Sequence, residues 1–232
     1  MLFLKLWFFA VVALALGITI NFILLKSGVK SLVLVSIISI SIAVILSYFK
    51  TYKRIFVVHN LTELAIYPGI AAVFVPILNV YTLVILLFLI SAYDMWAVWK
   101  SKIMQKMAKY QINHLNIFSG FFLPYLGKKD RAKLRELKFK YKNSKNLNKK
   151  IKGKKIKVNL AILGGGDVVF PIIAAGVFLK YSGLGHAILI ILGALLGLSY
   201  LFFFAEKKKF YPAMPFITIG MFFGAILGYL IL

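Results

Sequence analysis

Three of the six acidic residues stand in stretches of sequence that are otherwise apolar enough to lie inside a membrane. They are Glu63, Asp94 and Asp167, while the other three lie in strongly basic segments. A charged side chain at mid-membrane costs about 2.5–3.5 kcal/mol or more. Each of the three is therefore a candidate functional group that must be protonated, hydrated or coupled to another carboxylate.

Asp94 and Asp167 could act together on a peptide bond. Two carboxylates that face each other in a low-dielectric site do not both ionise readily, so they share one proton. The ionised aspartate can take a proton from water, while the protonated one polarises the scissile carbonyl and later protonates the leaving amine. This chemistry needs no metal or other cofactor, and the sequence does not distinguish the base from the acid. With three His and no Cys, a multi-histidine metal centre and thiolate chemistry are disfavoured.

The elements that must position these aspartates are membrane helices. Hydrophobic residues make up 62% of the 232-residue chain, and the mean hydropathy is +0.91. A hydrocarbon core of about 30 Å takes roughly 20 helical residues to cross. Apolar runs of about that length occupy residues 2–25, 31–49, 55–78, 80–99, 158–179, 185–205 and 210–231. The sequence therefore predicts an all-α, polytopic membrane helix bundle of about seven spans.

The first apolar run raises the question of a cleaved signal peptide, because it contains Lys5 and an Ala13-Leu14-Ala15 triplet. Its apolar stretch continues to Leu25, whereas the apolar core of a signal peptide has about 7–15 residues. A retained membrane span is the better interpretation.

The charge distribution predicts how the spans are oriented. The formal net charge is +23, and 19 of the 29 basic residues lie between Lys100 and Lys157. A basic segment tethered to spans at both ends is typical of a cytoplasmic loop on the anionic inner leaflet, rather than of a nucleic-acid-binding region. The chain then divides into N-terminal membrane helices (1–100), a basic cytoplasmic loop (101–157) and a C-terminal three-helix unit (158–232). The N-terminus falls in the cytoplasm and the C-terminus outside.

Three motifs are predicted to lie at similar depth in this arrangement. Measured from the nearest cytoplasmic basic residue at about 1.5 Å per helical residue, Asp94 lies roughly 9 Å deep and Asp167 roughly 15 Å deep. Residues 212–214 begin roughly 5 Å in. All three belong to the cytoplasmic half of the bilayer and could meet around one cavity.

The motifs resemble those of a known family. The segments "AYDMWAVWKSKIM" (92–104), "GGGDVVFP" (164–171) and "YPAMPF" (211–216) are similar in order and spacing to the signatures of the presenilin and signal-peptide-peptidase intramembrane aspartyl proteases, and look closest to the archaeal homologues. The YD motif is matched by Tyr93-Asp94, the GxGD motif by Gly164-Gly165-Gly166-Asp167, and Pro212-Ala213-Met214 stands where the family has Pro-Ala-Leu. The resemblance runs from about His59 to the C-terminus.

The resemblance implies a protease whose helices surround a water-accessible site. Asp94 and Asp167 would be catalytic, without a metal or cofactor, and the substrates would be transmembrane or signal-peptide-like helices that unwind in the bilayer. The substrate-binding positions carried over from the motifs are Tyr93, Gly164, Gly165, Gly166, Pro212, Ala213 and Met214. The glycines would let the substrate backbone approach Asp167.

The sequence departs from the family pattern in two ways. Members usually have nine spans, and the two that the chain lacks would be the first two, so it is either a natural short form or incomplete at its N-terminus. Met214 replaces the leucine of Pro-Ala-Leu, a change of similar volume that costs little.

Several alternatives stay open at this stage. The acidic residues could line a proton or cation path, although no internal repeat typical of transporters is evident. The chain could be an inactive homologue that binds membrane helices, or a prepilin-type peptidase, which the YD and Pro-Ala-Met motifs disfavour. Tyr93 could belong to an interfacial aromatic belt, and Glu63 could be a structural glutamate bonded to a neighbouring helix. The oligomeric state is not predicted.

Overall fold

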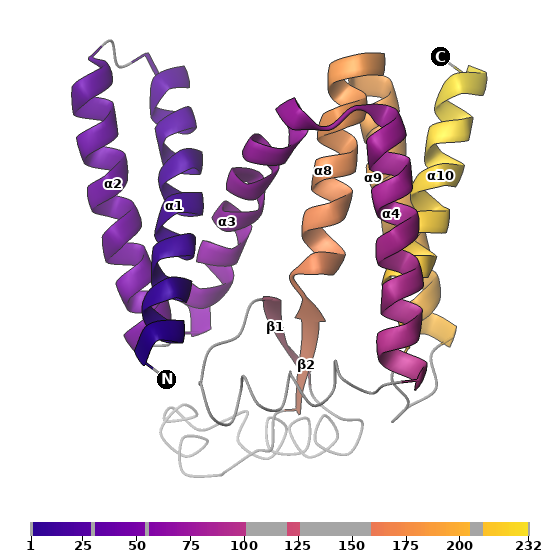
Figure 1. Ribbon diagram of the computed structural model, residues 1–232, viewed down its shortest axis with the longest axis horizontal. Coiled ribbons are helices and arrows are strands. Elements are labelled where there is room, and N and C mark those ends of the chain that lie inside the picture. The colour runs from indigo at the N-terminus through magenta and orange to yellow at the C-terminus, as the bar shows by residue number, and fades with distance from the viewer. Residues whose placement is uncertain are drawn as a thin grey trace, which may run out of the picture. The chain divides into compact units, whose positions relative to one another are not determined.

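The computed structural model describes residues 2–28, 31–53, 56–100, 120–125, 159–204 and 211–231. The described part of the chain is dominated by helices (Figure 1). The α-helices are α1 (Leu2–Lys26), α2 (Leu32–Tyr48), α3 (Phe56–Ile77), α4 (Val80–Met95), α8 (Gly166–Ser182), α9 (Leu184–Phe204) and α10 (Met214–Ile231). Two π-helical turns, η1 (Phe49–Lys53) and η2 (Trp96–Lys100), extend α2 and α4. The fold is the all-α polytopic membrane bundle that the hydropathy predicts.

Six of the described helices are long and apolar enough to cross a membrane. The seventh, α8, has 17 residues and is therefore about 26 Å long, slightly less than the hydrocarbon core. The spans begin at defined caps where polar residues are available. At the start of α4, for example, the Thr82 N–H donates to the Asn79 side chain at 2.9 Å, and the Asn79 N–H donates to the Thr82 hydroxyl at 3.0 Å. The chain is a multi-pass membrane protein.

The span predicted over residues 158–179 differs from the observed structure at its start. Residues Asn159–Gly164 form a strand, β2, which pairs with β1 (Gly120–Tyr125) in a two-stranded sheet, and α8 begins only at Gly166. A short apolar run reads the same in a strand as in a helix by hydropathy alone, and the glycines at 164–166 favour a break in the helix. The depth predicted for Asp167 assumed a helix from residue 158 and does not apply.

Glycines allow α9 and α10 to pack with their backbones in contact. A Cβ added at Gly193 or Gly197 of α9 would overlap backbone atoms of Gly220 or Phe216 of α10. The same holds in reverse for Gly220, which lies against the Gly193 carbonyl. Close packing through small residues is a common way for membrane helices to associate, since lipid supplies no hydrophobic driving force between them.

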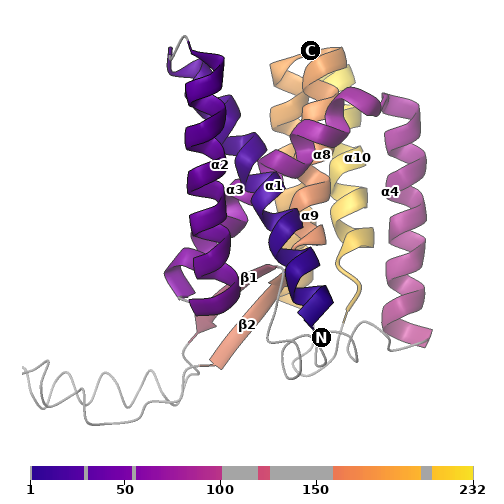
Figure 2. The ribbon, with the colours of Figure 1, turned by 60° about the vertical axis from the view of Figure 1, so that its left-hand side comes forward.

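The helices that carry the predicted site lie together in one compact unit, formed by residues 1–120 and 164–232. Figure 2 shows α8, α9 and α10 gathered beside one another, with α4 next to α10. The apolar core of this unit includes Leu83 and Leu87 of α4, Val177 of α8 and Ile217 of α10, each nearly inaccessible. The second unit comprises residues 121–163. Most of the predicted basic loop, 101–157, lies outside the described residues.

Candidate active site

Asp94 lies near the end of α4 and is buried, with 7% of its surface exposed. Its Oδ2 atom accepts a hydrogen bond from the Met214 backbone N–H at 3.0 Å. Met214 is the first residue of α10, where the backbone N–H groups have no partner within the helix. Asp94 therefore caps α10 from a different helix, and the positive end of that helix stabilises a negative charge there.

A second bond holds α4 against α10 on the same side. The hydroxyls of Ser91 and Thr218 lie 2.8 Å apart, and Thr218 is buried. Ser91 precedes Asp94 by three residues, so the two side chains share one face of α4. The contact between the YD helix and the start of α10 is thus made by side-chain and backbone polar groups together.

Asp167 occupies the first turn of α8 and is partly buried. The Gly164 backbone interacts with its carboxylate, and the negative charge of Asp94 acts on it as well. A Cβ added at Gly164 would lie 3.1 Å from Asp167 Oδ2, a tighter contact than is usual. Asp94, near the end of α4, and Asp167, in the first turn of α8, are thus close enough for their charges to interact.

The three glycines before Asp167 serve different local purposes. None of them has a positive φ among the described residues, so their backbone conformation does not require glycine. Gly164 is crowded by Asp167, Gly165 is the N-cap of α8, and Gly166 is exposed. The lack of a side chain is therefore most clearly needed at Gly164, where the backbone closely approaches the carboxylate.

The Pro-Ala-Met segment forms the entry to α10. Pro212 and Met214 are buried and Ala213 is partly buried. Residues 211–213 are not helical, and α10 starts at Met214. Non-helical backbone at membrane depth is tolerated where protein or a water-filled cavity surrounds it.

Tyr93 lies on the exposed side of α4. Its side chain is 60% exposed, and its ring centroid is 6.1 Å from that of Trp96. This is the arrangement expected of an aromatic belt at the membrane interface. Asp94 is buried although it follows directly, because successive helical residues point about 100° apart.

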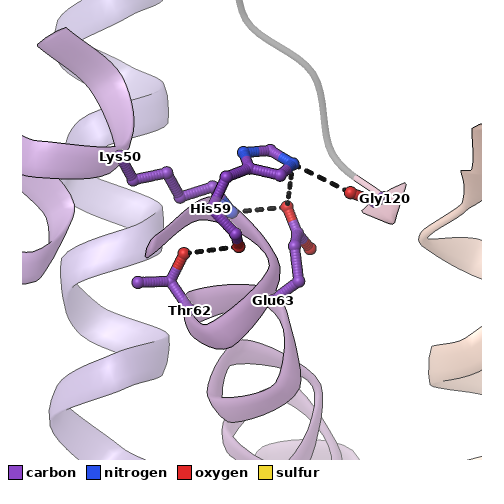
Figure 3. Close-up of polar contacts among 5 residues, drawn as sticks. All are labelled: Lys50, His59, Thr62, Glu63 and Gly120. Carbon is purple, nitrogen blue, oxygen red and sulfur yellow. Dashed lines mark hydrogen bonds and ion pairs between the residues drawn. The ribbon is translucent and has the colours of Figure 1, made fainter. Parts of the chain in front are cut away.

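The sequence did not predict a buried charged cluster that joins α2, η1 and α3 (Figure 3). Lys50 is 4% exposed and Glu63 is fully buried, with the Lys50 Nζ 2.5 Å from Glu63 Oε1. His59 Nε2 lies 3.7 Å from the same oxygen and donates a hydrogen bond to the Gly120 carbonyl at 2.9 Å. The pair could have been predicted from the sequence, because Lys50 follows one span and the oppositely charged Glu63 lies in the next.

Metal ligands do not gather in the part of the chain that the structure describes. There, no group of three or more His, Cys, Asp or Glu side chains lies close enough to hold a metal ion.

The comparisons with known proteins bear on the chain as a whole. No curated protein and no solved structure gives a significant match. The family model described as "Signal-peptide peptidase, presenilin aspartyl protease" matches residues 2–232. The chain therefore belongs to the signal-peptide peptidase and presenilin family of aspartyl proteases.

Proposed function

We propose that this chain is an intramembrane aspartic endopeptidase in which Asp94 and Asp167 hydrolyse a peptide bond through an activated water. One observation carries the proposal. The buried Asp94 carboxylate lies within range of the Asp167 charge and accepts the Met214 N–H. Met214 thus contacts Asp94, and Gly164 lies against Asp167, so residues of all three sequence motifs lie beside the two aspartates.

In this proposal the two aspartates share one proton, because two nearby carboxylates in a low-dielectric site do not both ionise readily. The Met214 N–H occupies one oxygen of Asp94 and holds the carboxylate in place. A carboxylate oxygen can accept more than one hydrogen bond, so the pair can still bind water and the scissile carbonyl. One aspartate acts as general base toward the water, and the other, protonated, donates to the carbonyl and then to the leaving amine.

The substrate class follows from where the site lies. Asp94 and the start of α10 are membrane-embedded, so the substrates are transmembrane or signal-peptide-like segments. A helical substrate must unwind to expose its peptide bond, since its carbonyl and N–H groups are otherwise bonded within the helix. Gly164, Gly165 and Gly166 supply a backbone without side chains beside Asp167. Tyr93, Pro212 and Ala213 would contact the extended substrate.

The orientation in the membrane is part of the same proposal. The N-terminus and the basic segment 101–157 lie in the cytoplasm, the latter on anionic lipids, because basic residues are retained on that side. The C-terminus lies outside. Because the motifs look closest to those of archaeal members, we expect this membrane to be the cell membrane.

Peptide cleavage by the reconstituted protein tests the proposal. The wild type and the Asp94→Asn and Asp167→Asn variants are placed in liposomes with a labelled transmembrane peptide, and the products are identified by mass spectrometry. Asparagine preserves the shape of the side chain but cannot exchange the proton, so both variants should lose cleavage by at least about a hundredfold. Asp130→Asn, which removes a carboxylate from the basic segment, is the matched control and should retain activity.

Three results would contradict the proposal in different ways. Cleavage that survives in either aspartate variant would exclude the two-aspartate mechanism. A folded wild type that binds the peptide without cutting it would indicate an inactive homologue. Proton or cation flux without cleavage would indicate conduction. The ion pair of Glu63 with Lys50 disfavours that alternative, because it gives Glu63 a structural role and leaves only Asp94 and Asp167 to line a conducting path.

A further inference from the structure

The charged cluster around Glu63 does not include either aspartate. One of its hydrogen bonds, however, is made to β1, the partner of the strand that precedes Asp167. His59 on α3 donates from Nε2 to the carbonyl of Gly120, a residue 61 positions later in the chain (Figure 3). A carbonyl can only accept, so the hydrogen resides on Nε2. The Gly120 residue is buried, and a buried carbonyl without a donor is costly. His59 therefore supplies a donor to this buried carbonyl and ties Gly120 to α3.

Glu63 and Lys50 hold the His59 ring in place. The Glu63 carboxylate, one helical turn further along α3, lies 3.7 Å from Nε2 and is itself bound by Lys50. The Thr62 hydroxyl donates to the His59 carbonyl at 2.8 Å. That bond is made to the backbone and does not restrain the ring. Because Lys50 and Glu63 are buried, the ring has little freedom to leave Gly120.

Gly120 is the first residue of β1, and β1 pairs with β2. Its φ of 140° is a conformation that residues with a side chain rarely adopt. The first residue of β1 therefore has a restricted backbone conformation, and the hydrogen bond from His59 stabilises it. A strand that is anchored at its first residue offers β2 a fixed partner.

The partner strand, β2, leads directly to the proposed catalytic residue. β2 ends at Gly164, α8 begins two residues later, and Asp167 is the second residue of α8. Gly164 is also the residue whose backbone lies against the Asp167 carboxylate. The position of the end of β2 consequently determines the position of Gly164 relative to Asp167.

We propose that His59 is a positioning residue for Asp167, acting through its hydrogen bond to Gly120 and the pairing of β1 with β2. This inference rests on the proposed peptidase function for its effect on catalysis, but not for its effect on the backbone. His59 touches neither aspartate. Its contribution is to hold the strand that precedes the GxGD motif.

The test compares two amides that differ by one methylene group. His59→Gln carries an N–H donor at nearly the reach of Nε2, whereas His59→Asn carries the same group too short to reach Gly120. Thr62→Val is the matched control, because it removes a buried hydrogen bond from the same turn of α3 and leaves the donor to Gly120 intact. Each protein is reconstituted at full length with a labelled transmembrane peptide.

Two readouts are measured on every variant. Hydrogen–deuterium exchange reports the backbone amides of residues 160–168, with α9 and α10 as the internal reference for folding. Steady-state cleavage gives kcat and KM separately. In His59→Asn we expect about tenfold faster exchange in residues 160–168 and about a tenfold lower kcat, a change of about 1.4 kcal/mol. KM, the exchange of α9 and α10, and both readouts in His59→Gln and Thr62→Val should stay within about twofold of wild type.

The proposal is overturned if the asparagine and glutamine variants behave alike, whether both match wild type or both are impaired, because the reach of the donor would then be irrelevant. It is also overturned if Thr62→Val reproduces the His59→Asn effect, which would indicate general loosening of α3. If the wild type cuts no peptide, the proposed function fails while the exchange comparison still decides the role of His59.

Discussion

Replacing Lys50 with methionine would leave the Glu63 carboxylate buried without its counter-ion. Glu63 is fully buried and Lys50 is 4% exposed, so water cannot replace the lost ammonium group. Removing one partner of a buried ion pair costs about 3–5 kcal/mol, compared with about 0–1 kcal/mol for an exposed pair. For a chain of this length, that corresponds to a fall in the midpoint of thermal unfolding of about 6–20 °C.

Two further variants identify the cause of such a loss. Lys53→Met removes an exposed lysine from the same π-helical turn, where the ammonium lies 5.0 Å from the Phe49 ring centroid, and should cost less than about 1 kcal/mol. The double variant Lys50→Met/Glu63→Leu removes both charges and should recover most of the stability, because well-packed apolar residues replace buried pairs at little or no cost.

Thermal unfolding in detergent, followed by circular dichroism, measures all of these variants under one condition. The reasoning is refuted if Lys50→Met and Lys53→Met unfold at the same temperature. It is equally refuted if the double variant is as unstable as Lys50→Met, since the cost would then come from lost packing rather than from an unpaired charge.

Two glycine substitutions test the packing of the helices and the site. Gly220→Ala should destabilise the protein by about 1–3 kcal/mol, because the added Cβ would overlap the Gly193 carbonyl across the α9–α10 contact. Gly17→Ala is the control, since a Cβ there would make only ordinary van der Waals contacts. It should be neutral or slightly stabilising in the same unfolding experiment. Gly164→Ala should lower kcat about threefold to tenfold, because the added Cβ would displace the Asp167 carboxylate slightly, and the unfolding midpoint should not change. Undiminished cleavage would show that the 3.1 Å approach of this Cβ to Asp167 Oδ2 does not matter for catalysis.

The helical architecture could be predicted from the sequence because hydropathy is a local property. Each apolar run satisfies its own backbone hydrogen bonds as a helix, so composition and length alone identify the spans. The exception lies at residues 159–164, where an apolar run forms a strand. Helix and strand bury such a run equally well, and only the presence of β1 as a hydrogen-bonding partner distinguishes them.

The candidate site was predictable as a set of residues but not as a set of contacts. Asp94 and Asp167 stand out because a carboxylate in an apolar run is costly and therefore uncommon. That Asp94 accepts the Met214 N–H, 120 residues later, could not be predicted, since any unpaired N–H at the start of any helix would have served. The exposure of Tyr93 likewise depends on which face of α4 meets α10.

The sequence by itself determined the membrane class and most of the helical spans, and it identified two aspartates as candidates, because these follow from transfer free energies and residue types along short segments. Tertiary structure alone decided which polar groups meet. The Lys50–Glu63 ion pair, the His59–Gly120 bond and the capping of α10 by Asp94 all join different helices or strands. Each forms only when helix packing brings a buried donor to a buried acceptor that would otherwise lack a partner.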